Sequence, residues 1–261
     1  MKEGAESEAA FQFLRKFNAF MGFLHLVQAV IMVALSNDFS LPITTSHLQV
    51  SVETFTAEMV TQEVATIRIG PAVALFLFIS AAAHFTLASP LGYSWYVRNL
   101  KKHINYLRWI EYSFSASLMI VLIALLVGVY DIGTLLALFT LTAVMNLMGL
   151  MMELHNQLTE KTNWTSYIIG CIAGAVPWIV IFISLLGAES TQGDPVPDFV
   201  IAIFISIAVF FNLFAINMVL QYKKVWKWKD YLYGEKMYVV LSLLAKSALA
   251  WQVFAGTLGP G

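Results

Sequence analysis

The chain has 261 residues, of which 59% are hydrophobic and only 12% are charged, with a mean hydropathy of +0.74. A soluble domain is about half apolar and about a quarter charged, so this composition excludes a soluble globular protein and indicates an integral membrane protein. The formal net charge of -1, without an arm rich in lysine, arginine and aromatic residues, excludes a nucleic-acid-binding protein. Cys171 is the only cysteine, which excludes an internal disulfide and a cysteine-based metal site. The N-terminal residues mix acidic and basic side chains, so no signal peptide is expected.

Seven segments are long and apolar enough to cross the hydrocarbon core, which takes about 20 mainly apolar residues per helix. They are too long and too uniformly apolar for the short alternating strands of a membrane barrel. We therefore predict an all-α membrane protein, a single seven-helix transmembrane domain over residues 1–261. The expected spans are residues 13–35, 69–89, 104–127, 132–153, 165–187, 199–221 and 236–257.

The first connection, residues 36–67, is longer than the others and differs in composition. It is rich in Thr, Val and Ile, and apolar and polar residues partly alternate around His47–Phe55. This pattern predicts a short extracellular β-hairpin. The hairpin could form a cap over the bundle or a surface that contacts a second copy in a dimer, and the two roles are compatible.

The charged residues predict the orientation. If the chain crosses seven times, nearly all basic residues share one face, so the positive-inside rule predicts a cytoplasmic N-terminus and an extracellular C-terminus in the plasma membrane. The basic face holds Lys2, Arg15, Lys16, Arg98, Lys101, Lys102, Arg108, Lys161, Lys223, Lys224, Lys227, Lys229 and Lys236. The opposite face has Arg68 among Asp38, Glu53, Glu58, Glu63, Asp131, Glu189, Asp194 and Asp198.

Ionisable side chains inside a membrane span are costly and indicate function by default. His25 lies in the first predicted span, His84 in the second, Glu111 in the third and Lys246 in the seventh, with Glu153 near the cytoplasmic end of the fourth. At about 1.5 Å per residue, Glu111 lies about 10 Å and Lys246 about 15 Å from the cytoplasmic ends of their spans. The two side chains could therefore meet across the bundle.

Other polar residues follow at helical spacing, which puts each set on one face of its helix. Five spans with a polar face predict a bundle whose interior is partly polar. The sets are Asn18, His25 and Gln28 in the first span, Ser80 and His84 in the second, Asn105, Arg108, Glu111 and Ser115 in the third, Thr142, Asn146, Gly149 and Glu153 in the fourth, and Ser242 with Lys246 in the seventh.

Each of these residues also has a purely structural interpretation. Lys246 and Glu111 could form an ion pair that only holds the bundle together, although such pairs recover little of their desolvation cost. The histidines could be hydrogen-bonded core residues, and Glu153 is expected to reach the lipid headgroups. Ordinary packing would account for Met145, Gly149, Trp178, Phe211 and Phe214.

A lysine in an apolar pocket also points to a specific chemistry. Desolvation favours the neutral amine, which attacks an aldehyde and forms a Schiff base. If the imine of Lys246 is protonated, one carboxylate must balance its charge, and Glu111 is the only acid in position to do so.

These residues resemble the microbial rhodopsins, and among them the heliorhodopsins. The general resemblance lies in seven spans with one lysine midway along the last and a carboxylate on the third. The specific resemblance lies in the cytoplasmic N-terminus, the strand-like first loop and the histidine pair His25 and His84. RWIEYSFSAS, with Arg108 three residues before Glu111, resembles the counterion region, and SLLAKSALAW resembles the retinal-lysine region. Ser242 stands where ion-pumping relatives carry a second aspartate, and the resemblance covers nearly the whole chain.

The resemblance implies all-trans retinal bound to Lys246 as a protonated Schiff base, with Glu111 as its counterion. Light would isomerise the retinal, and the imine proton would leave and later return. The resemblance further implies a proton-accepting region of His25, His84, Arg108 and Asn105, and a retinal site with Ser80, Tyr112, Met145, Gly149, Trp178, Phe211, Phe214 and Ser242. The expected partners are membrane lipids, a second copy in a homodimer and a cytoplasmic signalling protein.

The distribution of acids favours a light sensor over a light-driven proton pump. A pump needs proton-binding groups on both sides of the imine, but the third span has no acid between Glu111 and Asp131, and the seventh has none after Glu235. The pump and a retinal-free membrane receptor or transporter remain the alternatives. Motifs for phosphate binding, zinc hydrolysis or a nucleophilic serine are lacking, so we expect neither an enzyme nor a metal site.

Overall fold

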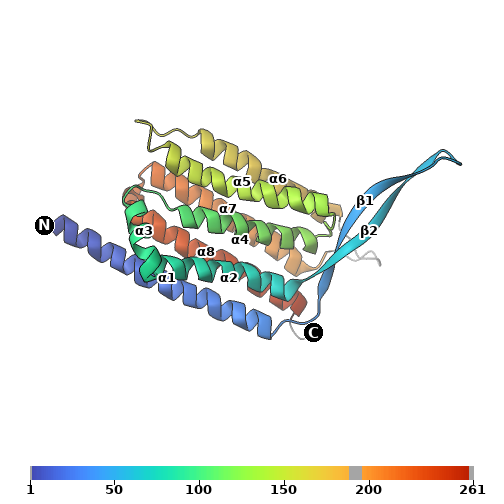
Figure 1. The fold of residues 1–261 in the computed structure, drawn as a ribbon, viewed down its shortest axis with the longest axis horizontal. Coiled ribbons are helices and arrows are strands. Elements are labelled where there is room, and N and C mark those ends of the chain that lie inside the picture. The colour runs from blue at the N-terminus through green and yellow to red at the C-terminus, as the bar shows by residue number, and fades with distance from the viewer. Residues whose placement is uncertain (1, 188–195, 259–261) are drawn as a thin grey trace.

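The structure, a computed structural model, describes residues 2–187 and 196–258 (Figure 1). Within these ranges seven helices are long and apolar enough to cross a membrane, which confirms the predicted seven-helix fold. Glu189 and Asp194, two of the acids behind the predicted orientation, lie outside the described residues. The spanning helices are α1 (Lys2–Ala34), α2 (Ile69–Ala88), α4 (Tyr106–Leu126), α5 (Ile132–His155), α6 (Thr165–Gly187), α7 (Asp198–Tyr222) and α8 (Tyr231–Val253).

Three short elements were not predicted. Helix α3 (Pro90–Leu100) occupies what the sequence indicated as a loop, although Ser89 caps it through a 3.0 Å hydrogen bond from the Gly92 amide and Pro90 opens it. A 3-10 turn, η1 (Trp226–Lys229), precedes α8, and a π-helical turn, η2 (Phe254–Leu258), follows it. Asp230 accepts a 2.9 Å hydrogen bond from the Leu232 amide and starts α8 five residues before the predicted span.

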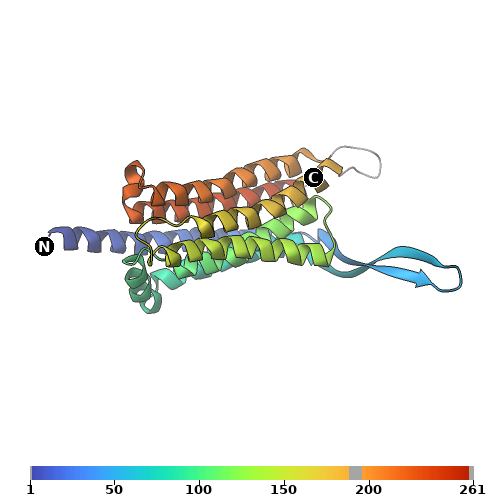
Figure 2. The same ribbon diagram turned by 90° about the horizontal axis from the view of Figure 1, so that it is seen from above.

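Strands β1 (Ser40–Ser51) and β2 (Thr56–Arg68) form the predicted hairpin as an antiparallel pair, with a bulge between Ile43 and Thr44. The hairpin is long rather than short, because 12 residues of one strand run beside 13 of the other. Its base is fixed to the bundle where the Thr44 amide donates to the Tyr130 carbonyl at 2.8 Å. The outer part of the hairpin extends past the bundle along its axis (Figure 2).

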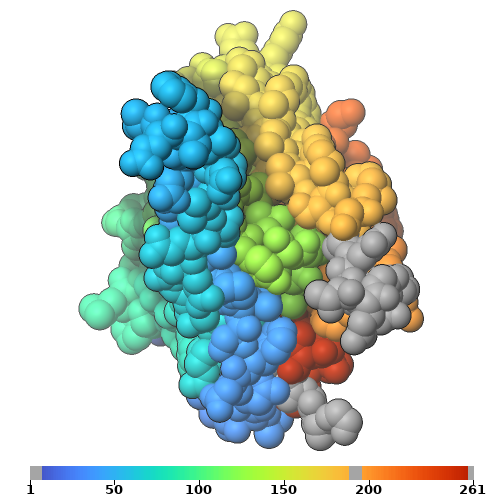
Figure 3. All heavy atoms as spheres, turned by 90° about the vertical axis from the view of Figure 1, so that its right-hand side faces the viewer, coloured from blue at the N-terminus to red at the C-terminus, as the bar shows by residue number. Residues whose placement is uncertain are grey.

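Only the base of the hairpin packs on the bundle, where Leu41, Ile43 and Ile67 contact its apolar core. Seen from its own end, the hairpin stands beside the start of α5, drawn in green, rather than over it (Figure 3). Its outer strands instead carry exposed apolar side chains, from Leu48, Val50 and Met59 to Phe55 in the turn, which is 90% exposed. The two predicted roles, a cap and a surface for contact with a second copy, both stay predictions.

The bundle interior divides into an apolar half and a polar half. In the half nearer the hairpin, Ile120 and Ile123 of α4 are almost completely buried against Phe76 of α2, Ile207 of α7 and Leu249 of α8. The buried polar and ionisable residues of α4 lie nearer the opposite end, where α3 packs. Because α4 is the most buried span, it carries residues of both halves through the centre of the bundle (Figure 1).

Candidate functional site

Lys246 and Glu111 meet inside the bundle. The Lys246 Nζ atom lies 2.7 Å from Glu111 Oε1 and 3.0 Å from Ser242 Oγ. Ser80 Oγ donates to the same Glu111 oxygen at 2.6 Å. The two charged side chains are only 4% and 5% exposed. Among the described residues, Lys246 and Glu111 are therefore each other's only ion-pair partner.

Helical spacing explains how these side chains converge. Ser242 and Lys246 lie four residues apart on α8, so they share a face. On α4 that face meets Glu111 and Tyr112, and the Lys246 Nζ atom lies 5.1 Å from the centre of the Tyr112 ring. The Tyr112 hydroxyl donates to the Tyr238 carbonyl at 2.9 Å, which fixes the ring beside the lysine.

Lys246 lines a small cavity of about 50 Å³ that borders a larger one of about 440 Å³. The larger volume lies within the range of about 300–1,000 Å³ that small-molecule sites occupy. Met145, Asn146, Phe211 and Phe214 line both cavities. The two cavities therefore adjoin, with the amine at one end and apolar space between α5, α6 and α7 at the other.

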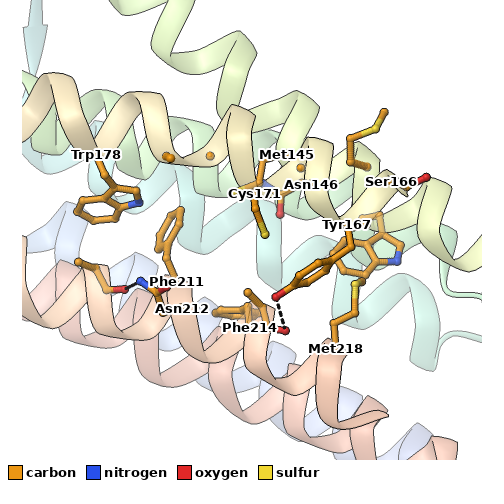
Figure 4. A pocket seen from close by; sticks show the side chains of 18 of the residues that line it. Met145, Asn146, Ser166, Tyr167, Cys171, Trp178, Phe211, Asn212, Phe214 and Met218 are labelled. Carbon is orange, nitrogen blue, oxygen red and sulfur yellow. Dashed lines mark hydrogen bonds between the residues drawn. The ribbon is translucent and has the colours of Figure 1, made fainter. Parts of the chain in front are cut away.

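All five residues predicted from the family resemblance for the polyene pocket line the larger cavity: Met145, Gly149, Trp178, Phe211 and Phe214. Trp178 comes from α6 and the two phenylalanines from α7, facing each other across the space (Figure 4). The rings meet edge to face, with Trp178 5.3 Å from Phe211 and Tyr112 5.3 Å from Phe214, as aromatic quadrupoles favour. Tyr167, which was not predicted, also faces the cavity from α6, and its hydroxyl donates to the Ala215 carbonyl at 3.4 Å.

Two glycines are required by close packing at this cavity. A Cβ atom at Gly149 would overlap the ring of Trp109, and one at Gly174 would overlap the side chain of Met145. A larger residue at either position would displace these side chains, both of which line the larger cavity. The two glycines are therefore required by the shape of that cavity wall.

His25 and His84 lie together, as the family resemblance implied. Their rings stack at 5.4 Å between centres and 12° between planes. His84 Nδ1 lies 2.7 Å from Asn18 Oδ1, whereas neither ring nitrogen of His25 has a partner among the described residues. Next to the pair, a Cβ atom at Gly22 would lie 3.1 Å from the His84 Cβ atom, so the helices approach closely here.

Arg108 does not contact Lys246 but forms a second buried ionic cluster. Its guanidinium pairs with Glu153 of α5 and Glu235 of α8. The Asn105 side chain also donates to Glu235, and the Asn105 amide donates to Glu153 at 2.9 Å. The expectation that Glu153 reaches the lipid headgroups is wrong, because it is 2% exposed and pairs with Arg108.

Glu235 is a further buried acid that was not predicted. The predicted seventh span begins at residue 236, which places Glu235 in the preceding connection. The cap at Asp230 starts the helix earlier and turns Glu235 inward, where it is fully buried. Arg108 in the third span is the sequence feature that indicates a buried Glu235, because a buried guanidinium needs carboxylate partners.

A hydrogen-bonded path joins the histidines to the Arg108 cluster. Asn18, which contacts His84, donates to the Tyr96 hydroxyl at 3.4 Å, and that hydroxyl donates to Glu235 at 3.1 Å. Burial, aided by the Glu235 carboxylate, raises the pKa of Tyr96 well above its ordinary value, so Tyr96 remains a proton donor. A cavity of about 20 Å³ lined by His84 and Glu111, and by Asn105, Arg108 and Glu235, connects this path with the Lys246 site.

Two comparisons with known proteins complete this picture. A comparison with curated proteins finds no significant match. The model of the heliorhodopsin family matches residues 14–258, a range that contains the Lys246–Glu111 pair, the histidines, both cavities and the hairpin. Because this match covers nearly the whole length and agrees with the resemblance of the two sequence stretches, the chain belongs to the heliorhodopsin family.

Proposed function

We propose that this protein is a light sensor that binds all-trans retinal at Lys246 and moves a proton within the bundle without net ion transport. As a heliorhodopsin, it is a retinal-binding, light-sensing rhodopsin. The observation that carries the proposal is the buried Lys246–Glu111 pair at the inner end of an apolar cavity.

The residues around Lys246 fit a retinal. The lining is aromatic and apolar apart from a few polar atoms, which suits a polyene with one polar end. Ser115, whose buried hydroxyl has no partner among the described residues, lines the same small cavity as Lys246 and offers it a polar contact. Bound as a Schiff base, retinal supplies visible absorption, isomerisation in light and an exchangeable proton on the imine nitrogen.

The side chains around Nζ then have distinct roles. Glu111 balances a positive charge on the Lys246 nitrogen, and Ser80 orients that carboxylate by donating to Oε1. Ser242 accepts from Nζ and fixes its direction. A proton that leaves Nζ is held by Glu111 or by the stacked His84 and His25.

The one-sided polar interior supports a sensor over a pump. From Glu111 the polar residues continue through His84 and Asn18 to Glu235, toward the end of the bundle where α3 lies. In the hairpin half, α4 continues with Met119, Ile120, Leu122 and Ile123, which are buried among other apolar residues. A proton can therefore leave and return on the same side, so a cycle moves no net charge.

We also propose the setting in which this sensor works. The cationic residues at the α3 end favour a plasma-membrane protein with a cytoplasmic N-terminus. The exposed apolar side chains of the hairpin favour a homodimer formed through it, and the basic end favours a cytoplasmic signalling partner.

The test is the absorption spectrum of the purified, retinal-supplied protein before and after hydroxylamine, which cleaves an imine. We expect a visible band that hydroxylamine bleaches and that Lys246→Ala abolishes entirely. Lys236→Ala, which removes another lysine from the same helix, is the control and should keep the band. A colourless wild-type protein would support the retinal-free receptor or transporter instead.

Light-induced pH changes in intact cells separate the sensor from the pump. We expect cells with the wild-type protein and cells with Lys246→Ala to show the same external pH in light. A signal that a protonophore abolishes and that Lys246→Ala lacks would establish proton transport and overturn the proposal of a sensor.

A further inference from the structure

The turn between α7 and α8 presents a tryptophan and several lysines outside the bundle. Trp226 of η1 is 71% exposed, and Val225 beside it is also exposed. Helix α7 has 25 residues, or about 37 Å at 1.5 Å per residue, which exceeds the hydrocarbon core of about 30 Å. The turn that follows α7 is therefore expected at the level of the lipid headgroups.

The turn has an unusual backbone conformation, and the side chain of Trp228 fixes it to α7 and α8. Lys224 and Trp226 have φ values of 52° and 47°, in the left-handed region that residues with large side chains rarely adopt. Trp228 anchors the turn, since its Nε1 donates to Asn217 Oδ1 at 2.6 Å and its ring meets Tyr233 at 5.0 Å. Such strained positions persist where surrounding contacts enforce them, and here the anchored Trp228 leaves Trp226 pointing outward.

Four lysines lie within three residues of Trp226 in the sequence, and all are exposed: Lys223, Lys224, Lys227 and Lys229. Lys227 Nζ lies 4.7 Å from the centre of the Trp226 ring. No ion pair joins any of these lysines to a carboxylate of the described residues. The adjacent acid, Asp230, accepts from the Leu232 amide as the cap of α8. The turn therefore has unbalanced positive charge.

We propose that Trp226 with Lys223, Lys224, Lys227 and Lys229, here called the η1 surface, binds anionic phospholipids of the adjacent leaflet. Tryptophan favours the membrane interface because its ring is apolar and its N–H is polar. Lysines near a membrane surface attract negatively charged lipids. The arrangement fits a phospholipid because the aromatic ring can lie among the upper acyl chains while the ammonium groups reach the phosphates. Retinal plays no part in this binding.

The experiment measures quenching of tryptophan fluorescence in vesicles of phosphatidylcholine that contain a small fraction of brominated lipid. Phosphatidylglycerol brominated near the headgroup is expected to quench more than phosphatidylcholine brominated in the same way. This excess quenching by phosphatidylglycerol should disappear in Trp226→Phe, because the indole ring that reports it is lost. It should also weaken at 1 M salt, where the Debye length falls to about 3 Å.

The double variant Lys227→Gln/Lys229→Gln should lower the preference for the anionic lipid by about thirtyfold, with quenching by neutral lipid unchanged. Lys101→Gln/Lys102→Gln removes the same charge at the end of α3 and should keep the excess. Trp251→Phe, at the opposite end of α8, should keep it as well. Equal quenching of Trp226 by both lipids, or equal losses in both lysine variants, would overturn the proposal and leave a soluble protein as the partner to consider.

Discussion

Glu111 accepts hydrogen bonds from two donors, Lys246 Nζ and Ser80 Oγ, through one oxygen. This geometry makes it the carboxylate whose charge acts most directly on the lysine nitrogen. Glu153 and Glu235 are equally buried but have Arg108 between them as their partner. The three buried acids of the polar half should therefore differ sharply in their effect on a chromophore.

Glu111→Gln is expected to shift the visible band to longer wavelength, because the neutral amide stabilises the positive charge of the ground state less than a carboxylate does. Glu153→Gln is the matched control, since it makes the same chemical change without contact to Lys246, and its band should stay in place. Absorption spectra of the two purified variants provide the measurement. A band unmoved in Glu111→Gln would show that another group is the counterion.

The residues at the centre of the site could be predicted because each is isolated in its segment. Lys246 stands alone in an apolar run, and Glu111 is the only acid of its span, so that each charge has few explanations. Glu153 and Glu235 lie at helix ends, where acids normally reach water. Their burial depends on Arg108 of another helix, and a pairing between distant helices leaves no periodic pattern in the sequence.

At the scale of the elements, the Arg108 cluster joins four helices. Arg108 belongs to α4, Glu153 to α5 and Glu235 to α8, and Tyr96 of α3 donates to Glu235. The guanidinium also lies 4.0 Å from the centre of the Tyr238 ring. One cation therefore offsets two buried carboxylates that would otherwise repel each other.

Arg108→Gln should destabilise the bundle by about 3–5 kcal/mol, because it leaves buried carboxylates without a counter-charge. Glu153→Gln should cost clearly less, because the remaining Arg108–Glu235 pair is neutral. Thermal denaturation of the two variants in the same detergent gives the comparison. A lower melting temperature for Glu153→Gln than for Arg108→Gln would contradict this explanation, in which the cation matters most because it offsets two carboxylates.

Five of the seven spanning helices agree with their predicted bounds within two residues at each end, because about 20 apolar residues in a row have one stable arrangement in a membrane. Helices α1 and α8 begin 11 and five residues earlier than predicted, because their first turns are polar and continue the helix beyond the apolar span. Helix α3 was missed although Ser89 and Pro90 are typical of a helix start, since the segment is too short and too polar for a span. The long hairpin was predicted as short because most residues of its outer part are exposed, so that burial imposes no regular alternation on their sequence.

At the scale of the whole molecule, the hairpin and the basic end lie at opposite ends of the bundle (Figure 1). The proposed orientation can be tested with single cysteines in a Cys171→Ser background. A maleimide that cannot cross membranes should label Thr54→Cys, in the hairpin turn, on intact cells. It should label Lys102→Cys, after α3, only once the cells are permeabilised. The reverse pattern would show the opposite orientation.

The closed apolar half of the bundle has a consequence for engineering. A proton-translocating variant would need a conductive route through the layer formed by Ile120, Ile123 and Leu249, and these side chains are fully enclosed. Placing one carboxylate there would bury an uncompensated charge instead of opening an exit. Conversion into an ion transporter should therefore require several coordinated replacements on α2, α4 and α8, together with room for water.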